Sequence, residues 1–346
     1  MLYRIIRELL FILPPEVSHY VALELLKLGS LLGINQLISR FKQRNLTHTP
    51  TRVMSIDFPN PVGIAAGLDK NGDYIAVFES LGFGFVEIGT VTPRPQAGNP
   101  KPRLFRLPAK NAIINRMGFN NKGVDYLVEQ VKKSSHKIPL GINIGKNFDT
   151  PIERAIDDYL ICFNKVYEHA DYIVINISSP NTPDLRNLQH GDHLQELLSE
   201  LNKQQAALAE KFDKYIPILV KVAPDLDQDE IESMSEIFLT QKIEGLITTN
   251  TSIDKNPVKE LLHGQETGGL SGEPIFAQSL KTQNAFYKAL GDKIPIIGVG
   301  GISDSESAIN RLNSGASLIQ IYTGFIYQGP GLLNDIVRKI SILKKN

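Results

Sequence analysis

The sequence predicts an α/β protein built as a closed (β/α)8 TIM barrel with an N-terminal helical hairpin extension. From Pro61 onward, short β-branched runs alternate with stretches of helical periodicity, which is the pattern of a parallel sheet covered by helices. Eight such runs occur, whereas an open doubly wound sheet usually has fewer strands and a dinucleotide-binding fingerprint that this chain lacks. Because the residues before the barrel differ in composition, we predict a helical segment, 1–44, and a barrel domain, 45–346.

The N-terminal segment carries apolar residues at helical spacing on both sides of a break at Pro14-Pro15. Two helices cannot bury such wide apolar faces against each other alone, and the segment is mildly cationic. Its composition fits an anchor on a membrane surface and equally a cap packed on the end of the barrel. The apolar positions are Leu2, Ile5, Ile6, Leu9 and Leu10 before the break and Val21, Leu25, Leu28 and Leu32 after it.

The eight predicted strands follow one another between residues 62 and 324. They are "VGIAAG" (62–67), "FVEIGT" (85–90), "LGINIG" (140–145), "YIVINIS" (172–178), "IPILVKVAP" (216–224), "GLITTN" (245–250), "IPIIGVGG" (294–301) and "SLIQIYTG" (317–324).

Polar side chains fall at or just beyond the C-terminal part of almost every predicted strand. In a barrel these ends converge on one face, where the loops that follow the strands build active sites. A purely structural barrel could use asparagines there to end ladders and begin turns. A polar residue at nearly every strand end favours a site instead. These residues are Asp69, Lys70, Thr90, Asn143, Asn176, Lys221, Thr249, Asn250, Tyr322 and Thr323.

The glycine-rich "IIGVGGIS" after the seventh unit, followed by "GASLIQIYTG", predicts a phosphate site. Glycines 298, 300 and 301 let backbone N–H groups approach an anion, and the loops after strands seven and eight of these barrels often hold a phosphate. The alternative is an ordinary tight turn.

Two lysines lie near the same face. Lys70 could neutralise a substrate carboxylate or could be a solvated loop lysine. Lys221 lies inside the apolar strand "ILVKVAP", and a buried cation needs a partner. A ligand that becomes anionic during the reaction, such as a reduced flavin, would be such a partner. A structural salt bridge inside the barrel is the competing interpretation.

Two loops, "NRMGFNNKG" (115–123) and "GGLSGEP" (268–274), have the Gly, Asn and Ser content that suits close contact with a flat polar ligand, although either could be a turn alone. Carboxamides present a donor and an acceptor together and so match the edge of a pyrimidine or related imide. The relevant side chains are Asn115, Asn176, Asn181 and Asn250.

Bulk composition excludes several other classes. Lys and Arg total 37 and balance 37 Asp and Glu, so the chain has no basic field for nucleic acid. Cys162 is the single cysteine, which rules out an intrachain disulfide and indicates a reducing compartment. His190 and His193 lack a clear third ligand, and we expect no metal site. No apolar run reaches the roughly 18 residues of a spanning helix, and the N-terminus does not resemble a secretory signal.

Taken together, the motifs resemble those of the dihydroorotate dehydrogenase family, specifically its quinone-dependent, membrane-associated class 2. The resemblance covers essentially the whole chain, including the hairpin. It implies FMN as cofactor, dihydroorotate as substrate, orotate as product and a place in de novo pyrimidine (UMP) synthesis. The motifs that carry it are "AAGLDK", "EIGTVTPRPQ", "KPRLFR", "NRMGFNN", "GINIGKN", "INISSPNTP", "APDL", "TNT", "TGGLSG", "PIIGVGGI" and "GFIY".

The resemblance also implies roles for individual residues. Ser179 aligns with the catalytic base of the family, and serine there, where the soluble branch has cysteine, agrees with class 2. His19 and Arg106 match positions near the quinone tunnel of similar proteins. The flavin would be held by Ala66, Gly67, Leu68, Asp69, Lys70, Thr90, Asn143, Asn176, Lys221, Thr249, Gly272, Gly301, Tyr322 and Thr323. The pyrimidine would be held by Lys70, Asn115, Arg116, Met117, Gly118, Phe119, Asn176, Asn181, Asn250 and Thr251.

The stretch "NISSPNT" then has a chemical interpretation, although it contains no histidine to activate a hydroxyl. Oxidation to orotate removes a proton from C5 and a hydride from C6, so a flavin on one side leaves the protein to take the proton on the other. A neutral serine is a poor base, but the substrate carbonyls acidify C5, and proximity with a proton exit through Thr182 or a water can suffice. The alternative is an ordinary turn after a strand.

The implied partners are dihydroorotate and orotate, a membrane quinone and, through residues 1–44, the membrane surface. We expect a monomer bound as a peripheral, monotopic protein to the cytoplasmic face of a bacterial cell membrane, with the hairpin as anchor and quinone channel. Rival hypotheses are another FMN barrel oxidoreductase acting on a different cyclic amide, a phosphate-ligand isomerase barrel, and a membrane-recruited scaffold with a degenerate site.

Overall fold

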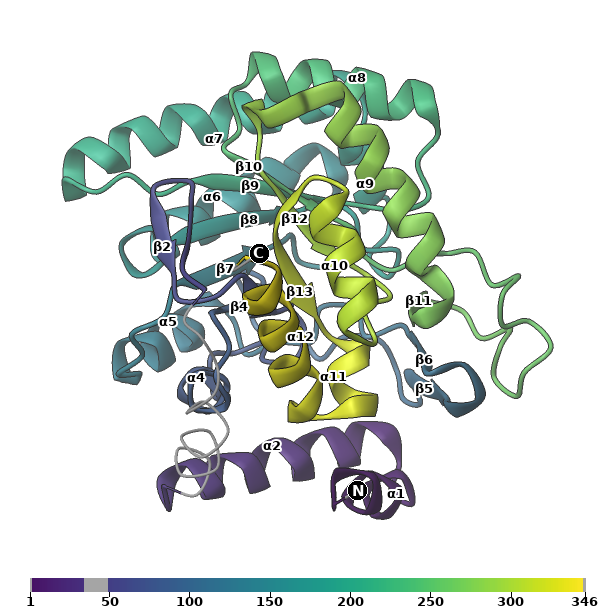
Figure 1. Cartoon of the computed structure of the whole chain (residues 1–346). Coiled ribbons are helices and arrows are strands. Elements are labelled where there is room, and N and C mark those ends of the chain that lie inside the picture. The colour runs from purple at the N-terminus through teal and green to yellow at the C-terminus, as the bar shows by residue number, and fades with distance from the viewer. Residues whose placement is uncertain (1, 34–48, 345–346) are drawn as a thin grey trace.

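The structure, a computed structural model, describes residues 2–33 and 49–344. Its centre is a closed barrel of eight parallel strands in the order β10-β12-β13-β3-β4-β7-β8-β9, as the sequence predicts (Figure 1). Each strand falls on one of the eight predicted runs, and only the ends differ by a few residues. The strands are β3 (Val62–Ile64), β4 (Phe85–Val91), β7 (Leu140–Ile144), β8 (Tyr172–Asn176), β9 (Ile218–Val222), β10 (Gly245–Thr248), β12 (Ile296–Val299) and β13 (Ala316–Ile321).

The barrel interior is a packed core. Inward-facing Phe85, Tyr172 and Leu219 are fully buried there. Space for these rings is made by glycines on neighbouring strands: a Cβ at Gly141 would lie 2.1 Å from the Tyr172 ring. An antiparallel pair, β1 (Thr51–Val53) and β2 (Ile56–Phe58), adds Val53 and Phe58 to this core. The filled interior leaves the ends of the barrel as the places where a ligand can bind.

Helices cover the outside of the barrel, and their apolar faces form the larger core against the strands. Side-chain capping fixes where two of them begin: the Asp227 carboxylate accepts from the Glu230 N–H at 2.8 Å, and Asp304 accepts from Ser307 at 2.7 Å. The helices are α4 (Ile75–Leu81), α5 (Val124–Lys133), α6 (Ala155–Val166), α7 (Gly191–Phe212), α8 (Gln228–Thr240), α9 (Phe276–Leu290), α10 (Ser305–Asn313), α11 (Thr323–Gln328) and α12 (Pro330–Leu343).

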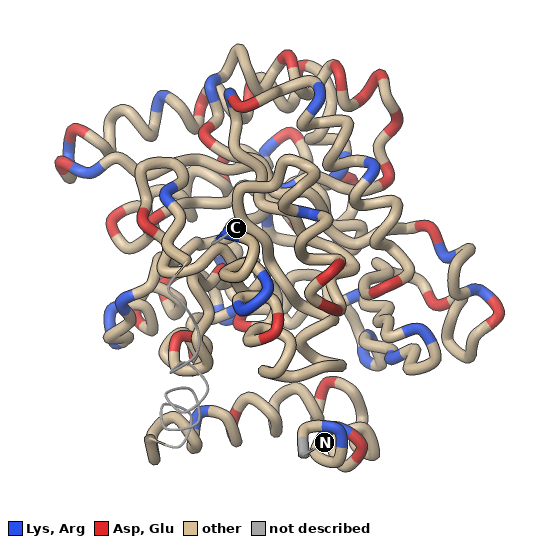
Figure 2. The backbone as a smooth tube through the Cα atoms, viewed as in Figure 1, with Lys and Arg blue, Asp and Glu red and all other residues tan. Residues whose placement is uncertain are grey.

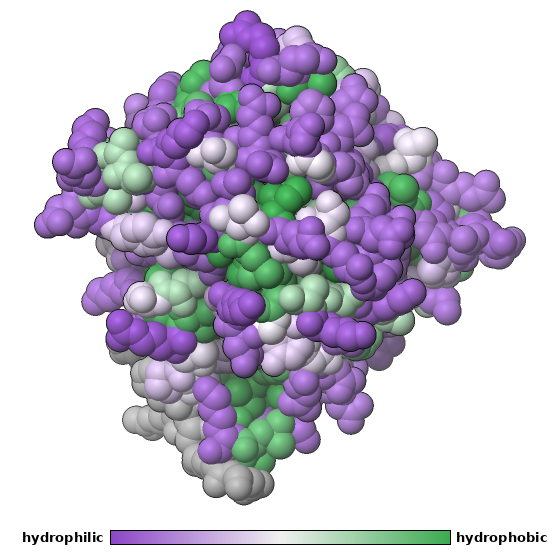
Figure 3. Space-filling model, turned by 90° about the horizontal axis from the view of Figure 1, so that it is seen from above, coloured by the Kyte–Doolittle hydropathy of each residue, from purple (hydrophilic) through white to green (hydrophobic). Residues whose placement is uncertain are grey.

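Charges of both signs are interspersed over these helices and loops (Figure 2). The face seen in Figure 3 is mostly hydrophilic, with hydrophobic residues gathered in a few patches. Neither sign of charge dominates the view in Figure 2.

A three-stranded antiparallel sheet with the order β11-β6-β5 lies outside the barrel. It consists of β5 (Leu104–Leu107), β6 (Ala112–Asn115) and β11 (Gly269–Gly272). The strand β11 follows β10 in the chain, whereas β5 and β6 follow β4, so the sheet joins the loops of distant barrel units. The sequence analysis did not predict this sheet: it treated residues 268–274 as a loop and assigned no strand to residues 104–107 or 112–115.

The N-terminal residues form the predicted hairpin, α1 (Leu2–Phe11) and α2 (Pro15–Leu31), with the break at Pro14. It lies as a separate layer against the barrel, where α2 contacts α4 and β5 and α1 contacts α11 (Figure 1). Tyr3 donates its hydroxyl to the Ile326 carbonyl at 2.7 Å, and the Tyr74 hydroxyl donates to Glu24 at 2.7 Å. The predicted boundary between residues 44 and 45 lies outside the described residues.

The hairpin is packed on the barrel and also exposes apolar side chains. Leu9 is 62 % exposed, Ile12 79 % and Leu31 78 %. The contacts with the barrel agree with a cap, and the exposed apolar side chains agree with an anchor on a membrane surface. Within residues 2–33 and 49–344, no helix has the length and apolar character needed to cross a bilayer.

Candidate active site

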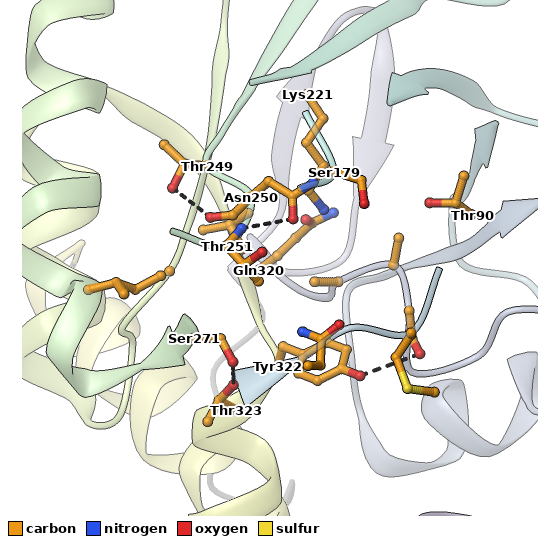
Figure 4. A pocket seen from close by; sticks show the side chains of 18 of the residues that line it. Thr90, Ser179, Lys221, Thr249, Asn250, Thr251, Ser271, Gln320, Tyr322 and Thr323 are labelled. Carbon is orange, nitrogen blue, oxygen red and sulfur yellow. Dashed lines mark hydrogen bonds between the residues drawn. The ribbon is translucent and has the colours of Figure 1, made fainter. Parts of the chain in front are cut away.

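A cavity of about 140 Å³ opens at the C-terminal ends of the barrel strands, on the face where the predicted polar residues converge (Figure 4). Most of the predicted site residues line it. They are Ala66, Gly67, Lys70, Thr90, Asn115, Met117, Gly118, Phe119, Asn176, Ser179, Asn181, Lys221, Thr249, Asn250, Thr251, Gly272, Gly301, Tyr322 and Thr323.

Four of the residues expected to hold the flavin or the pyrimidine do not line this cavity. The Asp69 carboxylate turns back into its own loop, where it accepts N–H groups of Gly72 at 2.8 Å and Tyr74 at 2.7 Å. Burial raises the pKa of Asp69 to about 6, although these hydrogen bonds oppose the rise. Arg116 points away to Glu266, at 2.7 Å. Leu68 lines a second cavity, and Asn143 lies beneath the first.

The floor of the cavity contains a buried ion pair. The Lys221 ammonium lies 3.5 Å from the Glu87 carboxylate, and both side chains are almost fully buried. Glu87 also accepts from Asn143 at 2.9 Å and from Gln320 at 2.5 Å. The structural salt bridge considered for Lys221 is therefore present, yet Lys221 also lines the cavity, so the protein can use the lysine in both ways.

Sequence reasoning missed Glu87 and Gln320. A signal was available, because "FVEIGT" and "SLIQIY" each place one polar residue inside an apolar strand, as "ILVKVAP" does. Three such residues in neighbouring parts of one barrel need each other as partners. The other lining residues that the analysis did not assign are Ala65, Pro180, Ser271, Ile275, Val299, Ile302, Ile321 and Gly324, whereas Gly300 belongs to the predicted phosphate turn.

A chain of hydrogen bonds orders the asparagines at the strand ends. Asn176 donates to Thr90 at 2.8 Å, and Thr90 donates to Asn143 at 2.5 Å. Asn250 donates to the Asn176 carboxamide oxygen at 3.3 Å and to the Ser178 hydroxyl at 3.1 Å. Because each amide is fixed by a neighbour, the donors and acceptors that face the cavity are held in place before any ligand binds.

Ser179 lies on the loop after β8, and its hydroxyl accepts the Asn181 N–H at 3.2 Å. The Asn181 carboxamide reaches the Asn115 carbonyl at 3.2 Å, which ties the loop to the other side of the cavity. Ser179 is 5 % exposed. The Thr182 hydroxyl, considered as a proton exit, is buried and has no hydrogen-bond partner among the residues that the structure describes.

Arg186, a residue that the sequence analysis did not single out, is hydrogen-bonded to the loop that carries Ser179. Its guanidinium donates to the Ser178 carbonyl at 3.2 Å, to the Thr251 carbonyl at 3.1 Å and to the Asp225 carboxylate at 3.0 Å. One side chain therefore sets the spacing between two loops that face the same cavity.

Lys70 also faces the cavity. Burial and the nearby Arg103 charge lower the pKa of its ammonium to about 8, although the Glu16 charge opposes both effects. The amine is a cation at neutral pH without a carboxylate in ion-pair contact among the described residues, so an anionic ligand group would be well placed beside it.

The glycine-rich turn lies at another part of the cavity wall. Gly300 and Gly301 have φ values of +109° and +73°, which favour glycine. A Cβ at Gly301 would lie 2.4 Å from Phe276, the first residue of α9. Elsewhere in the lining, Ser271 and Thr323 share a hydrogen bond of 2.8 Å (Figure 4). The turn thus places backbone groups at the wall, as an anion-binding loop requires.

A second cavity, about 660 Å³ in volume, lies between the hairpin and the barrel. His19 and Arg106, the two residues expected near a quinone, both line it. The Arg106 guanidinium lies 4.3 Å from the Phe11 ring and donates to the Leu13 carbonyl. Burial lowers the pKa of His19 to about 4, so the imidazole is neutral at pH 7. The rest of the lining is mostly apolar and comes from α1, α2 and α11.

Tyr322 lines both cavities. It follows β13, and its hydroxyl approaches the Gly67 carbonyl at 3.4 Å. Burial raises the pKa of Tyr322 to about 12, so the phenol is neutral. The two cavities are therefore neighbours across this one side chain.

Comparisons with known proteins agree with this geometry. A family model described as dihydroorotate dehydrogenase matches residues 49–343. The chain is 54 % identical over 341 residues to a protein of Acinetobacter baylyi named dihydroorotate dehydrogenase (quinone), which covers 99 % of this chain and 100 % of that protein. A Vibrio parahaemolyticus protein of the same name is 54 % identical over 342 residues, with 98 % and 100 % covered.

Among solved structures, DHODH of Eimeria tenella in complex with ferulenol is similar to this chain with a TM-score of 0.84 and 35 % identity. The similarity covers 96 % of this chain and 92 % of that one. A ligand-free DHODH structure from the same organism gives a TM-score of 0.80 with 39 % identity, over 87 % and 88 % of the two chains.

Proposed function

The chain belongs to the dihydroorotate dehydrogenase family, and from this premise we propose that it oxidises (S)-dihydroorotate to orotate with FMN as hydride acceptor and a membrane quinone as final electron acceptor. The reaction would serve de novo pyrimidine (UMP) biosynthesis. One observation carries the proposal: a polar cavity that contains Ser179, Lys221 and the glycine-rich turn adjoins a mostly apolar cavity at Tyr322. A water-soluble substrate and a lipid-soluble acceptor each have a compartment of matching polarity.

The residues present fit a flavin. The glycine-rich turn offers backbone N–H groups for a phosphate. Gln320 lines the same cavity, and its Oε1 is buried without a hydrogen-bond partner among the described residues, so a ligand N–H could satisfy it. The holding residues would be Gly67, Thr90, Asn143, Lys221, Thr249, Gly272, Gly301, Tyr322 and Thr323, with Asn143 acting from beneath. When bound, the flavin supplies a two-electron acceptor for the hydride from C6 of the substrate.

The substrate would bind through the asparagines. The carboxamides of Asn176 and Asn250 are oriented by the hydrogen bonds described above, and the Asn115 Oδ1 accepts from Asn181 at 3.4 Å; these three groups suit the imide edge of the ring. Lys70 would pair with the substrate carboxylate. Such fixed donors and acceptors orient the ring without a further cost in reorganisation.

Ser179 would remove the C5 proton. Its hydroxyl accepts from Asn181, which leaves the Oγ lone pairs partly free, and Arg186 holds the loop behind it. Loss of the proton from C5 and of the hydride from C6 creates the double bond of orotate, so the electrons balance. The exit of the proton from Ser179 through Thr182 or a water stays a prediction.

The hairpin would bring the protein to the bilayer. Its exposed leucines and isoleucines and its contacts with the second cavity favour a peripheral, monotopic protein that takes quinone from lipid. We expect the cytoplasmic face of a bacterial cell membrane and a monomer.

An anaerobic titration of the purified protein with dihydroorotate tests this function. The flavin absorbance near 450 nm should bleach stoichiometrically and return when a quinone analogue is added. A protein without bound flavin, or a flavin that dihydroorotate leaves oxidised, would exclude the proposal. A phosphate-ligand isomerase predicts the first result, and another flavin oxidoreductase predicts the second.

A further inference from the structure

Arg311 of α10 is a buried cation that forms no ion pair with an acidic residue of the described segments, 2–33 and 49–344. Its side chain is fully buried. Its guanidinium donates to the Gln283 carboxamide oxygen at 3.0 Å and to the Gly300 carbonyl at 2.5 Å. Its Nε has no hydrogen-bond partner among the described residues. Neutral acceptors satisfy part of the guanidinium, which also lies 5.3 Å from the centroid of the Phe276 ring, and none of these contacts supplies a negative charge.

Burial of the charge shifts the pKa of the Arg311 guanidinium. Burial alone lowers the pKa of Arg311 to about 9, with no carboxylate to raise it. The group still carries a positive charge at neutral pH. A buried charge of this kind is retained where an anion compensates it, and ion pairs of the described chain do not include this residue.

The absence of a side chain at Gly298 leaves space for Gln283 and Arg311. A Cβ at Gly298 would lie 2.6 Å from the Gln283 Oε1 and 3.2 Å from the Arg311 Cδ. Gln283 in turn donates to the Arg311 carbonyl at 2.9 Å and to the Ser314 carbonyl at 3.0 Å. Gly298, Gln283 and Arg311 therefore form one fitted unit behind the end of β12.

This unit lies directly behind the glycine-rich turn of the first cavity. The Gly300 carbonyl, which accepts from Arg311, and the Gly301 N–H belong to the same peptide group. In a trans peptide the C=O and N–H groups point in opposite directions and their dipoles are aligned, so a cation beside the oxygen makes the N–H hydrogen more positive. Both glycines line the cavity, and no hydrogen bond from the Gly301 N–H to another group occurs in the described part of the chain. The guanidinium thus polarises the peptide whose N–H remains available to a ligand.

We propose that Arg311 is a positioning residue for the phosphate of the flavin cofactor, acting through the Gly300–Gly301 peptide and through its own uncompensated charge. The inference rests on the proposed function, because it takes FMN as the occupant. It predicts that the chain selects the phosphorylated flavin over riboflavin and that this preference depends on a residue that never touches the cofactor.

The test is a titration of the deflavinated protein with FMN and with riboflavin, followed by quenching of flavin fluorescence. Arg311→Met should weaken FMN binding at least about tenfold, as expected for loss of a charge close to an anion at low dielectric, and change riboflavin binding less than about twofold. Arg311→Lys should restore most of the FMN affinity. Arg338→Met, at an exposed arginine of α12, is the matched control and should change neither.

Should Arg311→Met not fold, Arg311→Gln provides the same comparison, since its amide can still donate to the Gly300 carbonyl without a charge. Equal weakening of both flavins would assign Arg311 to fold stability and overturn the proposal, as would unchanged FMN binding. A wild-type protein that binds neither flavin would instead remove the proposed function itself.

Discussion

Glu16 of α2 and Arg103 form a buried, two-pronged ion pair, with 2.7 Å between Oε1 and Nη2 and 3.2 Å between Oε2 and Nε. The remaining Arg103 nitrogen donates to the carbonyls of Ala97 at 2.6 Å and Asn99 at 2.9 Å. Asn99 in turn donates to the carbonyl of Met117, which lines the first cavity, at 3.1 Å. The hairpin is therefore bonded to the scaffold of the candidate pyrimidine loop.

Glu16→Gln should destabilise the protein by about 3–5 kcal/mol, because it leaves the Arg103 charge buried without its partner. Equilibrium urea unfolding measures this change. Asp57→Asn breaks the exposed pair with Arg52 and should alter stability by less than about 0.5 kcal/mol. Equal effects of the two substitutions would contradict the importance of the buried pair.

The same pair gives stability a dependence on pH. Burial raises the pKa of Glu16, but the hydrogen bond and charge of Arg103 outweigh it, and the net pKa lies below the ordinary 4.5. For a carboxyl with a lowered folded-state pKa, the stabilisation is complete above 4.5 and is lost as the pH falls below it. The melting temperature of the wild type should therefore fall more steeply below pH 4.5 than that of Glu16→Gln.

The His19 imidazole should also make the stability of the protein depend on pH, between pH 6.5 and 4. Burial and the Lys70 charge lower the pKa of its imidazole to about 4, although the Glu16 charge opposes them. Between pH 6.5 and 4 the unfolded chain binds a proton that the folded chain does not, so stability decreases as the pH falls through this range. The melting temperature of His19→Gln should decrease less across it. A parallel decline in both proteins would show that the imidazole does not titrate as expected.

Ser179→Ala should slow reduction of the bound flavin by dihydroorotate about 10²–10⁴-fold, the usual contribution of a positioned base, while the flavin stays bound. Stopped-flow absorbance measures the rate, and the flavin content after gel filtration is the control. Ser178→Ala, at the neighbouring hydroxyl that pairs with Asn250, should have a much smaller effect. If the Ser179 variant reduced its flavin at the wild-type rate, Ser179 could not be the catalytic base.

Variants of Lys221 and of its ion-pair partner Glu87 can distinguish a structural salt bridge from a role in stabilising reduced flavin. Lys221→Met alone leaves Glu87 buried without a cation and should cost about 3–5 kcal/mol of stability. The double variant Lys221→Met, Glu87→Gln should recover most of that stability. If the lysine also stabilises reduced flavin, the flavin reduction potential of the double variant stays below that of the wild type. A wild-type potential in the double variant would make the lysine purely structural.

The exposed apolar residues of the hairpin should determine binding to lipid. Ile12→Asn combined with Leu31→Asn removes two side chains that are 79 % and 78 % exposed and should reduce flotation with anionic vesicles severalfold. Reduction by dihydroorotate should stay unchanged. Leu262→Asn, at an 82 % exposed leucine of the barrel domain, is the control and should float like the wild type. Unaltered flotation of the hairpin variant would count against a membrane anchor.

The fold could be predicted from the sequence because each of its eight parallel strands is a short apolar run, and that periodicity depends only on local residues. The polar residues at strand ends were informative for the same reason. Asp69 shows the limit of such reasoning: it follows a strand, yet its carboxylate bonds to its own loop. Strand position fixes where a residue lies, whereas the direction of its side chain depends on neighbours that are distant in the chain.

Partners distant in sequence also explain what sequence reasoning missed. Glu87 and Lys221 are more than a hundred residues apart, and the antiparallel sheet joins β6 to β11 across a similar interval. Arg186 contacts Ser178 and Thr251 through carbonyls that any residue type would present. Contacts of this kind leave no residue-specific pattern that a single sequence could reveal.

If the two cavities hold the flavin and the quinone as proposed, Tyr322 determines how far an electron must travel between them. Since this phenol borders both cavities, the separation between a donor on one side and an acceptor on the other is set by the thickness of an aromatic side chain. The donor and the acceptor therefore need neither direct contact nor the same cavity. A bulkier or smaller residue at this position would therefore change the transfer distance without altering either binding chamber.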